Sequence, residues 1–197
     1  MKKLFSLILV ISILCSLFSG FAALAADDLV KGELLVNGDF ELYGTSFGKW
    51  SGTADNVMFG LAHSGNRSMK VAAEKQKIMM QKVYNIEPGQ EYTFSAWLYV
   101  EELGDASESI GGGMKIEFYG NDKPAGNSKY ECFPGEYGKW TKCSIGAIAP
   151  EGADTLVAFL RIDCGGVIYW DDASVIGAVK RENYEEIANE RDMAASA

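Results

Sequence analysis

The chain has 197 residues, of which 18 are Lys or Arg and 27 are Asp or Glu, giving a formal net charge of −9. This length suits one ordinary domain with a sizeable core, and the acidic balance argues against nucleic acid as a partner, because phosphate binding needs a basic surface. A single His excludes a metal centre with several His ligands, whereas an aromatic share of 12% and 22 Gly favour a binding protein over an enzyme.

Residues 1–25 have the order of a secretory signal peptide. Lys2 and Lys3 precede an apolar run from 4 to 18, and 23–25 (Ala-Leu-Ala) place small residues at positions −3 and −1 of a cut before Ala26. The run is short for a membrane-spanning helix, and no later stretch is long enough to span a bilayer. We therefore expect the segment to be removed and the mature protein to be secreted, without a membrane anchor.

From Gly32 to Gly177, short apolar runs alternate with turns rich in Gly, Asn, Asp and Pro, a pattern typical of β-strands. The runs predict strands at 34–36, 68–72, 78–84, 91–100, 115–119, 140–148, 155–162 and 167–175. Before residue 178 the sequence holds no amphipathic helical pattern of useful length. These features predict an all-β fold, an antiparallel β-sandwich or barrel, across residues 26–177.

Side chains alternate across the predicted strand 91–100. One face is apolar and suits a sandwich core, whereas the other carries Trp97 and Tyr99 among small polar residues. The predicted strand 115–119 repeats this design, with Lys115, Glu117 and Tyr119 on one face. If both faces lie on the same sheet, they form one surface of rings and charged groups.

The character of the chain changes after Gly177. Residues 178–197 are rich in Glu, Arg and Ala, and Tyr184 and Ile187 have helical spacing. This segment predicts either a short helical tail or a disordered one.

Three cysteines, Cys132, Cys143 and Cys164, remain after removal of the first segment. Cys132 and Cys143 flank a turn-rich stretch, so one reading is a disulfide between neighbouring strands in an oxidising compartment. The other reading is three partly buried thiols that behave as small apolar side chains.

Several segments, in a fixed order, resemble the carbohydrate-binding modules of families 4, 9 and 22, which accompany bacterial xylanases and glucanases. They are VNGDFE at 36–41, HSGNRSMKV at 63–71, QKV at 81–83, IEPGQEYTFSAW at 86–97 and IYWDDASV at 168–175. The resemblance covers about residues 33–177. It implies a jelly-roll β-sandwich of the galactose-binding-domain type, without catalytic activity, that binds a glycan chain in a cleft on one sheet.

A glycan binder needs flat rings for the C–H faces of sugars and polar groups for their hydroxyls. Candidates of these types on predicted strands are Trp97, Tyr99, Glu117, Tyr119 and Arg161, with Trp50 and Gln81 as further candidates. Trp50 is also a natural core residue, and Gln81 shares its strand parity with Val83 and so can face the core. Glu117 and Arg161 can alternatively form a solvated cross-strand pair.

The resemblance also implies a structural calcium ion that links the N-terminal segment to the last strand. Glu41 and Asp171 match the ligand positions of the family, and hard carboxylate oxygens suit Ca²⁺. Asp172 replaces Asp171 if a bulge changes the register. The alternative is that these acids only cap loops.

The expected function is a secreted, non-catalytic carbohydrate-binding module that recognises a polysaccharide such as β-1,4-xylan or a β-glucan, with a glycoside hydrolase in the same system as a partner. The sequence lacks a phosphate-cradling loop and an H-E-x-x-H run, and His63 and Ser64 lie in a turn. Two alternatives stay open: an extracellular structural or adhesion sandwich, and a small glycan-active hydrolase or lyase, whose paired carboxylates leave no short signature.

Overall fold

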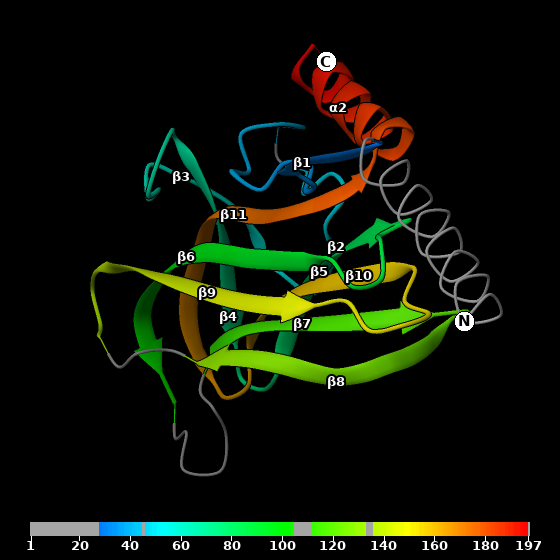
Figure 1. Cartoon of the computed structure of the whole chain (residues 1–197). Coiled ribbons are helices and arrows are strands. Elements are labelled where there is room, and N and C mark those ends of the chain that lie inside the picture. Colours follow the sequence, from blue (N-terminus) through cyan, green and yellow to red (C-terminus); the bar gives the residue numbers. More distant parts are fainter. Residues whose placement is uncertain (1–27, 45, 105–111, 133–135, 197) are drawn as a thin grey trace, which may run out of the picture.

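The computed structural model describes residues 28–44, 46–104, 112–132 and 136–196. The chain folds into two stacked antiparallel sheets, followed by a helix at the C-terminus (Figure 1). The prediction of an all-β antiparallel sandwich is confirmed.

One layer, sheet A, has the strand order β3-β4-β11-β6-β9, with β1 added to β11. Its strands are β1 (Leu29–Glu33), β3 (Asn56–Phe59), β4 (Arg67–Ala73), β6 (Glu91–Leu103), β9 (Trp140–Ile148) and β11 (Gly166–Lys180). The other layer, sheet B, has the order β2-β5-β10-β7-β8. Its strands are β2 (Ser51–Gly52), β5 (Lys77–Tyr84), β7 (Gly112–Gly120), β8 (Lys123–Cys132) and β10 (Thr155–Ile162).

The core lies between the two sheets and follows the period-two pattern of the strands. In β6 every second side chain is fully buried, namely Tyr92, Phe94, Ala96, Leu98 and Val100. β10 supplies Leu156, Ala158, Leu160 and Ile162 from the opposite sheet. The residues between these positions point away from the core, so each sheet presents an outer face.

The apolar alternation predicts the strands from residue 68 onward well, but it misses others. The first predicted strand is wrong, because the strand ends at Glu33 and 34–36 follows it without strand structure. The apolar side chains of 34–36 are nevertheless buried in the core. β8 was not expected, because its sequence KPAGNSKYEC contains a Pro and a Gly and lacks apolar alternation. Its antiparallel pairing with β7 holds this strand in the sheet.

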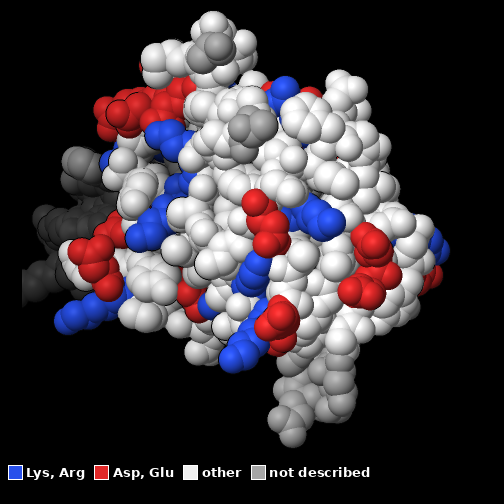
Figure 2. All heavy atoms as spheres, turned by 180° about the vertical axis from the view of Figure 1, so that it is seen from behind, with Lys and Arg blue, Asp and Glu red and all other residues white. Residues whose placement is uncertain are grey.

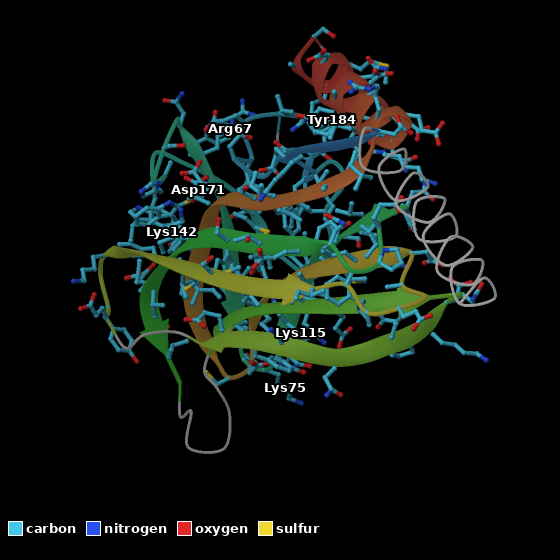
Figure 3. The ribbon with its side chains drawn as sticks, in the orientation of Figure 1. Arg67, Lys75, Lys115, Lys142, Asp171 and Tyr184 are labelled. Atoms are coloured by element: carbon cyan, nitrogen blue, oxygen red, sulfur yellow. The ribbon has the colours of Figure 1, made fainter. Side chains whose placement is uncertain are left out.

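The segment expected to be a helical or disordered tail contains the end of β11 and helix α2 (Arg181–Ala195). Tyr184 of α2 packs on Gly32 of β1, where a Cβ atom would lie only 2.4 Å from the Tyr184 ring. Figure 3 shows Tyr184 at the base of the helix, above the sandwich. A glycine at position 32 therefore lets the helix dock closely on the strand.

The two sheets meet at one side of the sandwich through their edge strands. β8 is the edge of sheet B and β9 the edge of sheet A, and both run along the same side in Figure 1. The Lys129 ammonium of β8 donates a hydrogen bond to the Gly146 carbonyl of β9 at 3.1 Å. This contact ties the two edges together.

Two sequence predictions fall outside the described residues. The predicted signal peptide, residues 1–25, is one, and the side chain of Cys132 is the other, so the bridge to Cys143 stays a prediction. Cys143 itself is buried in β9. Within the described part of the chain, no helix combines the length and the apolar character needed to cross a membrane.

Candidate functional site

Outward side chains of sheet B form three rows across its strands, set by the antiparallel register. The rows are Tyr130, Lys115, Phe159 and Met80; then Glu117, Val157 and Lys82; then Tyr119, Thr155 and Tyr84. All of these except Tyr130, together with Asp122, line a depression of about 560 Å³, which we call the sheet B cleft. Its volume lies in the range of about 300–1,000 Å³ that is usual for ligand sites.

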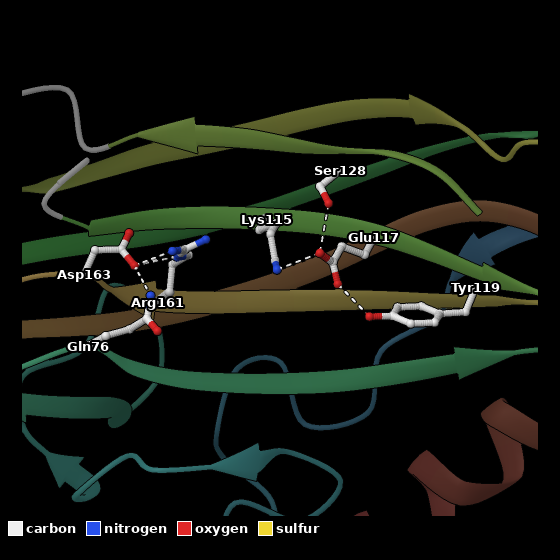
Figure 4. Close-up of polar contacts among 7 residues, drawn as sticks. All are labelled: Gln76, Lys115, Glu117, Tyr119, Ser128, Arg161 and Asp163. Atoms are coloured by element: carbon white, nitrogen blue, oxygen red, sulfur yellow. Dashed lines mark hydrogen bonds and ion pairs between the residues drawn. The ribbon is translucent and has the colours of Figure 1, made fainter. Parts of the chain in front are cut away.

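A hydrogen-bond network centred on Glu117 forms one wall of the cleft (Figure 4). The Lys115 ammonium lies 2.7 Å from Glu117 Oε1, and the Ser128 hydroxyl donates to the same oxygen at 2.8 Å. The Tyr119 hydroxyl donates to Glu117 Oε2 at 2.9 Å. These three donors, from β7 and β8, fix the carboxylate in one orientation.

The charge of Glu117 follows from these contacts. Burial raises the pKa of the Glu117 carboxyl, but the hydrogen bonds donated by Lys115, Ser128 and Tyr119, with the charge of Lys115, outweigh it, so the pKa lies below its usual range. In turn, the bond to Glu117 and partial burial raise the pKa of the Tyr119 hydroxyl. Glu117 is therefore a fixed anion and Tyr119 a neutral donor at neutral pH.

Aromatic rings and cations contact one another in the first row and next to it. The Lys115 ammonium lies 4.2 Å from the centre of the Phe159 ring, and the Arg161 guanidinium lies 5.3 Å from that of Tyr130. Asp163 orients Arg161 by accepting a hydrogen bond from its Nε at 2.9 Å, and it also accepts one from Gln76 at 2.7 Å. This second cluster lies beyond Lys115 on the same face (Figure 4).

Trp97 and Tyr99 lie on the other layer. They project from the outer face of β6 in sheet A, whereas Glu117, Tyr119 and Arg161 project from sheet B. The two polar and aromatic faces of the sequence are therefore back to back, and the single surface expected from β6 and β7 does not form. His63 stacks on Trp97 with ring centres 3.7 Å apart, and Tyr99 lies 5.6 Å from Trp140.

Trp50 and Gln81 are both buried, each 4% exposed. The Trp50 indole donates to the Asn37 carbonyl at 3.0 Å. The Gln81 amide accepts from the Val36 N–H at 2.8 Å and donates to the Val36 carbonyl at 2.9 Å. Both side chains thus hold the segment after β1 against the core, and neither reaches the outer face of sheet B.

Sequence reasoning missed several residues of the sheet B cleft. Phe159 shares the outward parity of Arg161 on β10, so the alternation contained the signal, although the strand reads as almost wholly apolar. Tyr84 has the same parity as Lys82 on β5. Ser128 carried no usable signal, because β8 was not recognised as a strand.

The predicted metal ligands Glu41 and Asp171 hold opposite ends of one loop. Glu41 Oε1 accepts the backbone N–H groups of Asn66 and Arg67, both at 2.7 Å. Asp171 Oδ2 accepts those of His63 at 2.7 Å and Ser64 at 3.2 Å.

Asp171 is completely buried, and burial raises the pKa of its carboxyl to about 6. Among the described residues, no three His, Cys, Asp or Glu side chains converge as a metal-binding group. A cation at this pair would therefore need backbone carbonyls to complete its shell.

His63 and Ser64 do not form a nucleophilic relay. His63 Nδ1 lies 2.6 Å from Asp172 Oδ2, and the Ser64 hydroxyl donates to Asp172 Oδ1 at 2.7 Å. A catalytic serine needs its hydroxyl bonded to the base, whereas here the Ser64 proton is donated to the acid. The trio instead fixes the loop to β11, where Asp172 adopts a φ of 47° beside a register shift.

The charges on the rear face are mixed in sign. Figure 2 shows Lys and Arg interspersed with Asp and Glu, separated by broad uncharged areas. The net charge of −9 is therefore not concentrated there as one acidic field.

A two-sheet antiparallel sandwich with a polar and aromatic depression on one outer face is the architecture of a ligand-binding module. The family described as "Carbohydrate binding domain" (CBM_4_9) matches residues 32–156, and the chain belongs to this family. The match ends inside β10, so β11 and α2 lie beyond it. A comparison with curated proteins gives no match.

Solved carbohydrate-binding modules share the fold. The CBM22-1–CBM22-2 tandem domain of Paenibacillus barcinonensis Xyn10C has a TM-score of 0.56 at 21% identity, covering 75% of this chain and 50% of that one. The CBM22-1–GH10 modules of Clostridium thermocellum xylanase 10B, complexed with xylohexaose, have a TM-score of 0.55 at 14% identity, covering 75% and 28%. Family 16 Carbohydrate Binding Module-2 has a TM-score of 0.53 at 19% identity, covering 72% and 98%.

Proposed function

We propose that the chain is a secreted, non-catalytic module that binds a β-1,4-linked polysaccharide, of xylan or β-glucan type, in the sheet B cleft. The observation that carries this proposal is the fixed Glu117 network beside the rings that line the cleft. Membership of the carbohydrate-binding family supports a glycan as the ligand. The xylohexaose complex of the xylanase 10B modules supports a xylan-type chain.

The cleft offers both kinds of contact that a sugar needs. Tyr84, which is 59% exposed, supplies a ring face for sugar C–H groups, whereas Phe159 is 8% exposed and lies at the floor of the cleft beside the Lys115 ammonium. Lys115, Lys82 and Glu117 supply charged donors and acceptors for hydroxyl groups. Because Glu117 is already oriented by its three donors, little side-chain entropy is lost when a glycan binds.

The charge state of Glu117 does not suit the proton-donor role of a glycosidase. A glycosidase needs a carboxylic acid that stays protonated and gives its proton to the leaving oxygen, so the pKa of that group is raised. The pKa of Glu117 is lowered instead. A glycoside hydrolase is therefore the partner that we propose for the chemistry, as in the xylanase 10B chain, where the module and the GH10 domain are fused.

The proposal includes a structural calcium ion at Glu41 and Asp171, with backbone carbonyls in the rest of its shell. Two observations support it: the carboxylates anchor the same loop, and Asp171 is a fully buried acid. A cation beside Asp171 would offset the cost of burying its negative charge. The ion would supply only electrostatic cross-linking between the loop and β11.

Affinity electrophoresis in gels that contain xylan, β-glucan or an unrelated polysaccharide tests the binding proposal. We expect slower migration in xylan or β-glucan gels and no release of reducing ends from either. Unchanged migration on every glycan would contradict the proposal and favour a structural or adhesion sandwich. Release of reducing ends would instead establish a hydrolase.

A further inference from the structure

Helix α2 borders a second hollow, outside the sheet B cleft. Its volume is about 860 Å³, and it lies between α2, β5 and the segment before β2. We call it the helix groove. Its side chains include Asn85 at the end of β5, Lys49 before β2, and Asn183, Glu186 and Glu190 from α2.

Three contacts fix α2 as the wall of this groove. Tyr184 packs on Gly32 of β1, and the Asn183 side-chain amide donates to the Asn85 carbonyl at 3.3 Å. The Lys49 ammonium lies 2.7 Å from Glu190 Oε1, and this bond to Glu190 raises the pKa of Lys49. The helix is thus attached along its length, from its first turn to its third.

The helix groove is continuous with the sheet B cleft. Met80, Lys82 and Tyr84 of β5 line both hollows. Tyr84 lies at the boundary with more than half of its surface exposed. In Figure 4, α2 appears at the lower right, on the side of β5 away from β10 and the Glu117 network. A chain that crosses β5 from the cleft therefore enters the groove.

The lining of the groove suits sugar hydroxyls. Glu186 is exposed, and within the described part of the chain its carboxylate makes no hydrogen bond or ion pair, so its lone pairs are available to a ligand. Lys82 points to the same space and supplies donors. With Tyr84 as a ring at the junction, the groove repeats the combination of stacking and hydrogen bonding found in the cleft.

We propose that the helix groove binds the continuation of the same glycan chain, so that α2 adds sugar subsites and makes affinity depend on chain length. This inference rests on the proposed function of the sheet B cleft. It assigns to the C-terminal helix, which lies outside the family match, a role in selecting long chains over short ones.

Titration calorimetry of the whole protein with xylotriose and xylohexaose, and in parallel with cellotriose and cellohexaose, tests the inference. We expect the wild type to bind the hexaose more tightly than the triose. Glu186→Ala should weaken hexaose binding by about three- to tenfold, the effect of losing one hydrogen bond of ordinary net strength, and leave triose binding unchanged. Glu185→Ala is the matched control, because Glu185 is the exposed neighbour on α2 and does not line the groove.

The two proposals fail in different ways. If the wild type binds neither length of either glycan, the cleft proposal fails and the groove proposal fails with it. If the wild type binds but Glu186→Ala behaves like Glu185→Ala with the hexaose, only the groove proposal is overturned. A second readout is the side-chain amide NMR signal of Asn183, which should shift with the hexaose and not with the triose; equal shifts with both would also overturn it.

Discussion

At the scale of the residue, Glu117 shows how a binding carboxylate is prepared before its ligand arrives. A carboxylate offers about four acceptor sites. Lys115 and Ser128 use Oε1, and Tyr119 uses Oε2. Oε2 therefore has a lone pair left for a ligand. The direction of this lone pair is fixed, because the three donors hold the carboxylate in place.

Glu117→Gln should lower the free energy of unfolding relative to the wild type at neutral pH, and this difference should disappear in acid. Because the pKa of Glu117 is lower in the folded protein than its ordinary 4.5, the stabilisation is fully present above the unfolded pKa and is lost as pH falls through the folded pKa. Urea unfolding at about pH 7 and about pH 3 measures the difference in free energy of unfolding. Glu131→Gln, at an exposed position of β8, is the control. If the loss of free energy of unfolding caused by Glu117→Gln is larger in acid than at neutral pH, the stabilising role of the Glu117 hydrogen bonds is contradicted.

Tyr84→Ala and Trp97→Ala distinguish the two outer faces. By analogy with bases stacked on aromatic side chains, loss of the Tyr84 ring should weaken oligosaccharide binding by about 1–3 kcal/mol. Trp97→Ala should leave binding unchanged, since Trp97 lies on the opposite layer beneath His63. Calorimetry with xylohexaose gives both values, and the reverse result would move the glycan site to sheet A.

Alternation along a strand allowed some site residues to be predicted and others not. It placed Glu117 and Tyr119 on one outward face, because parity is a local property of the strand. It also puts Gln81 on the same side as the core residue Val83, but it does not show how the amide is satisfied there, because its partner Val36 lies 45 residues away and uses both groups of the amide.

At the scale of the element, the sequence pattern predicts most strands but does not predict which sheet each strand joins. β6 and β7 follow one another along the chain, yet they belong to opposite layers. The apolar alternation of a strand does not tell which sheet the strand joins, because the strand buries the same apolar face in either sheet. For this reason the sequence pattern predicts one surface for Trp97, Tyr99, Glu117 and Tyr119, although the two pairs lie on opposite layers.

The loop after β1 depends on a glycine that approaches β11 closely. The Ala173 N–H donates to the Gly38 carbonyl at 2.8 Å, and a Cβ atom on Gly38 would lie 1.8 Å from the Ala173 carbonyl oxygen. Gly38→Ala must therefore displace backbone, and we expect it to lower the free energy of unfolding by about 1–3 kcal/mol or more.

Gly146→Ala is the matched control for this substitution. The added Cβ of Gly146 would meet only the Glu91 side chain, at an ordinary 3.6 Å. Thermal unfolding followed by circular dichroism compares the two variants. An equal melting temperature for both would show that the loop moves without cost.

At the scale of the whole molecule, Glu41 and Asp171 anchor one loop to the N-terminal segment and to the last strand at the same end of the sandwich, in addition to the backbone ladder between β1 and β11. Figure 3 shows Asp171 and Arg67 at this end, away from Lys115 of the sheet B cleft. A cation here would cross-link the molecule at a distance from its binding face.

Removal of calcium should therefore lower the melting temperature and leave glycan affinity little changed. We expect EDTA to lower Tm by several degrees and added CaCl₂ to restore it, because a ligand bound only by the folded state stabilises that state. Asp171→Asn should abolish the response. If EDTA leaves the Tm of the wild type unchanged, the loop amides alone neutralise these acids.

The tie between the sheet edges affects how the protein meets other copies of itself. An edge strand with open N–H and C=O groups is a template for the strand of another chain, and repeated addition leads to aggregation. On β9 the Gly146 carbonyl is already bound by Lys129 of β8. A strand approaching that edge would have to displace this hydrogen bond and meet the positive charge of Lys129, so a contact that closes the sandwich also discourages polymerisation at high concentration.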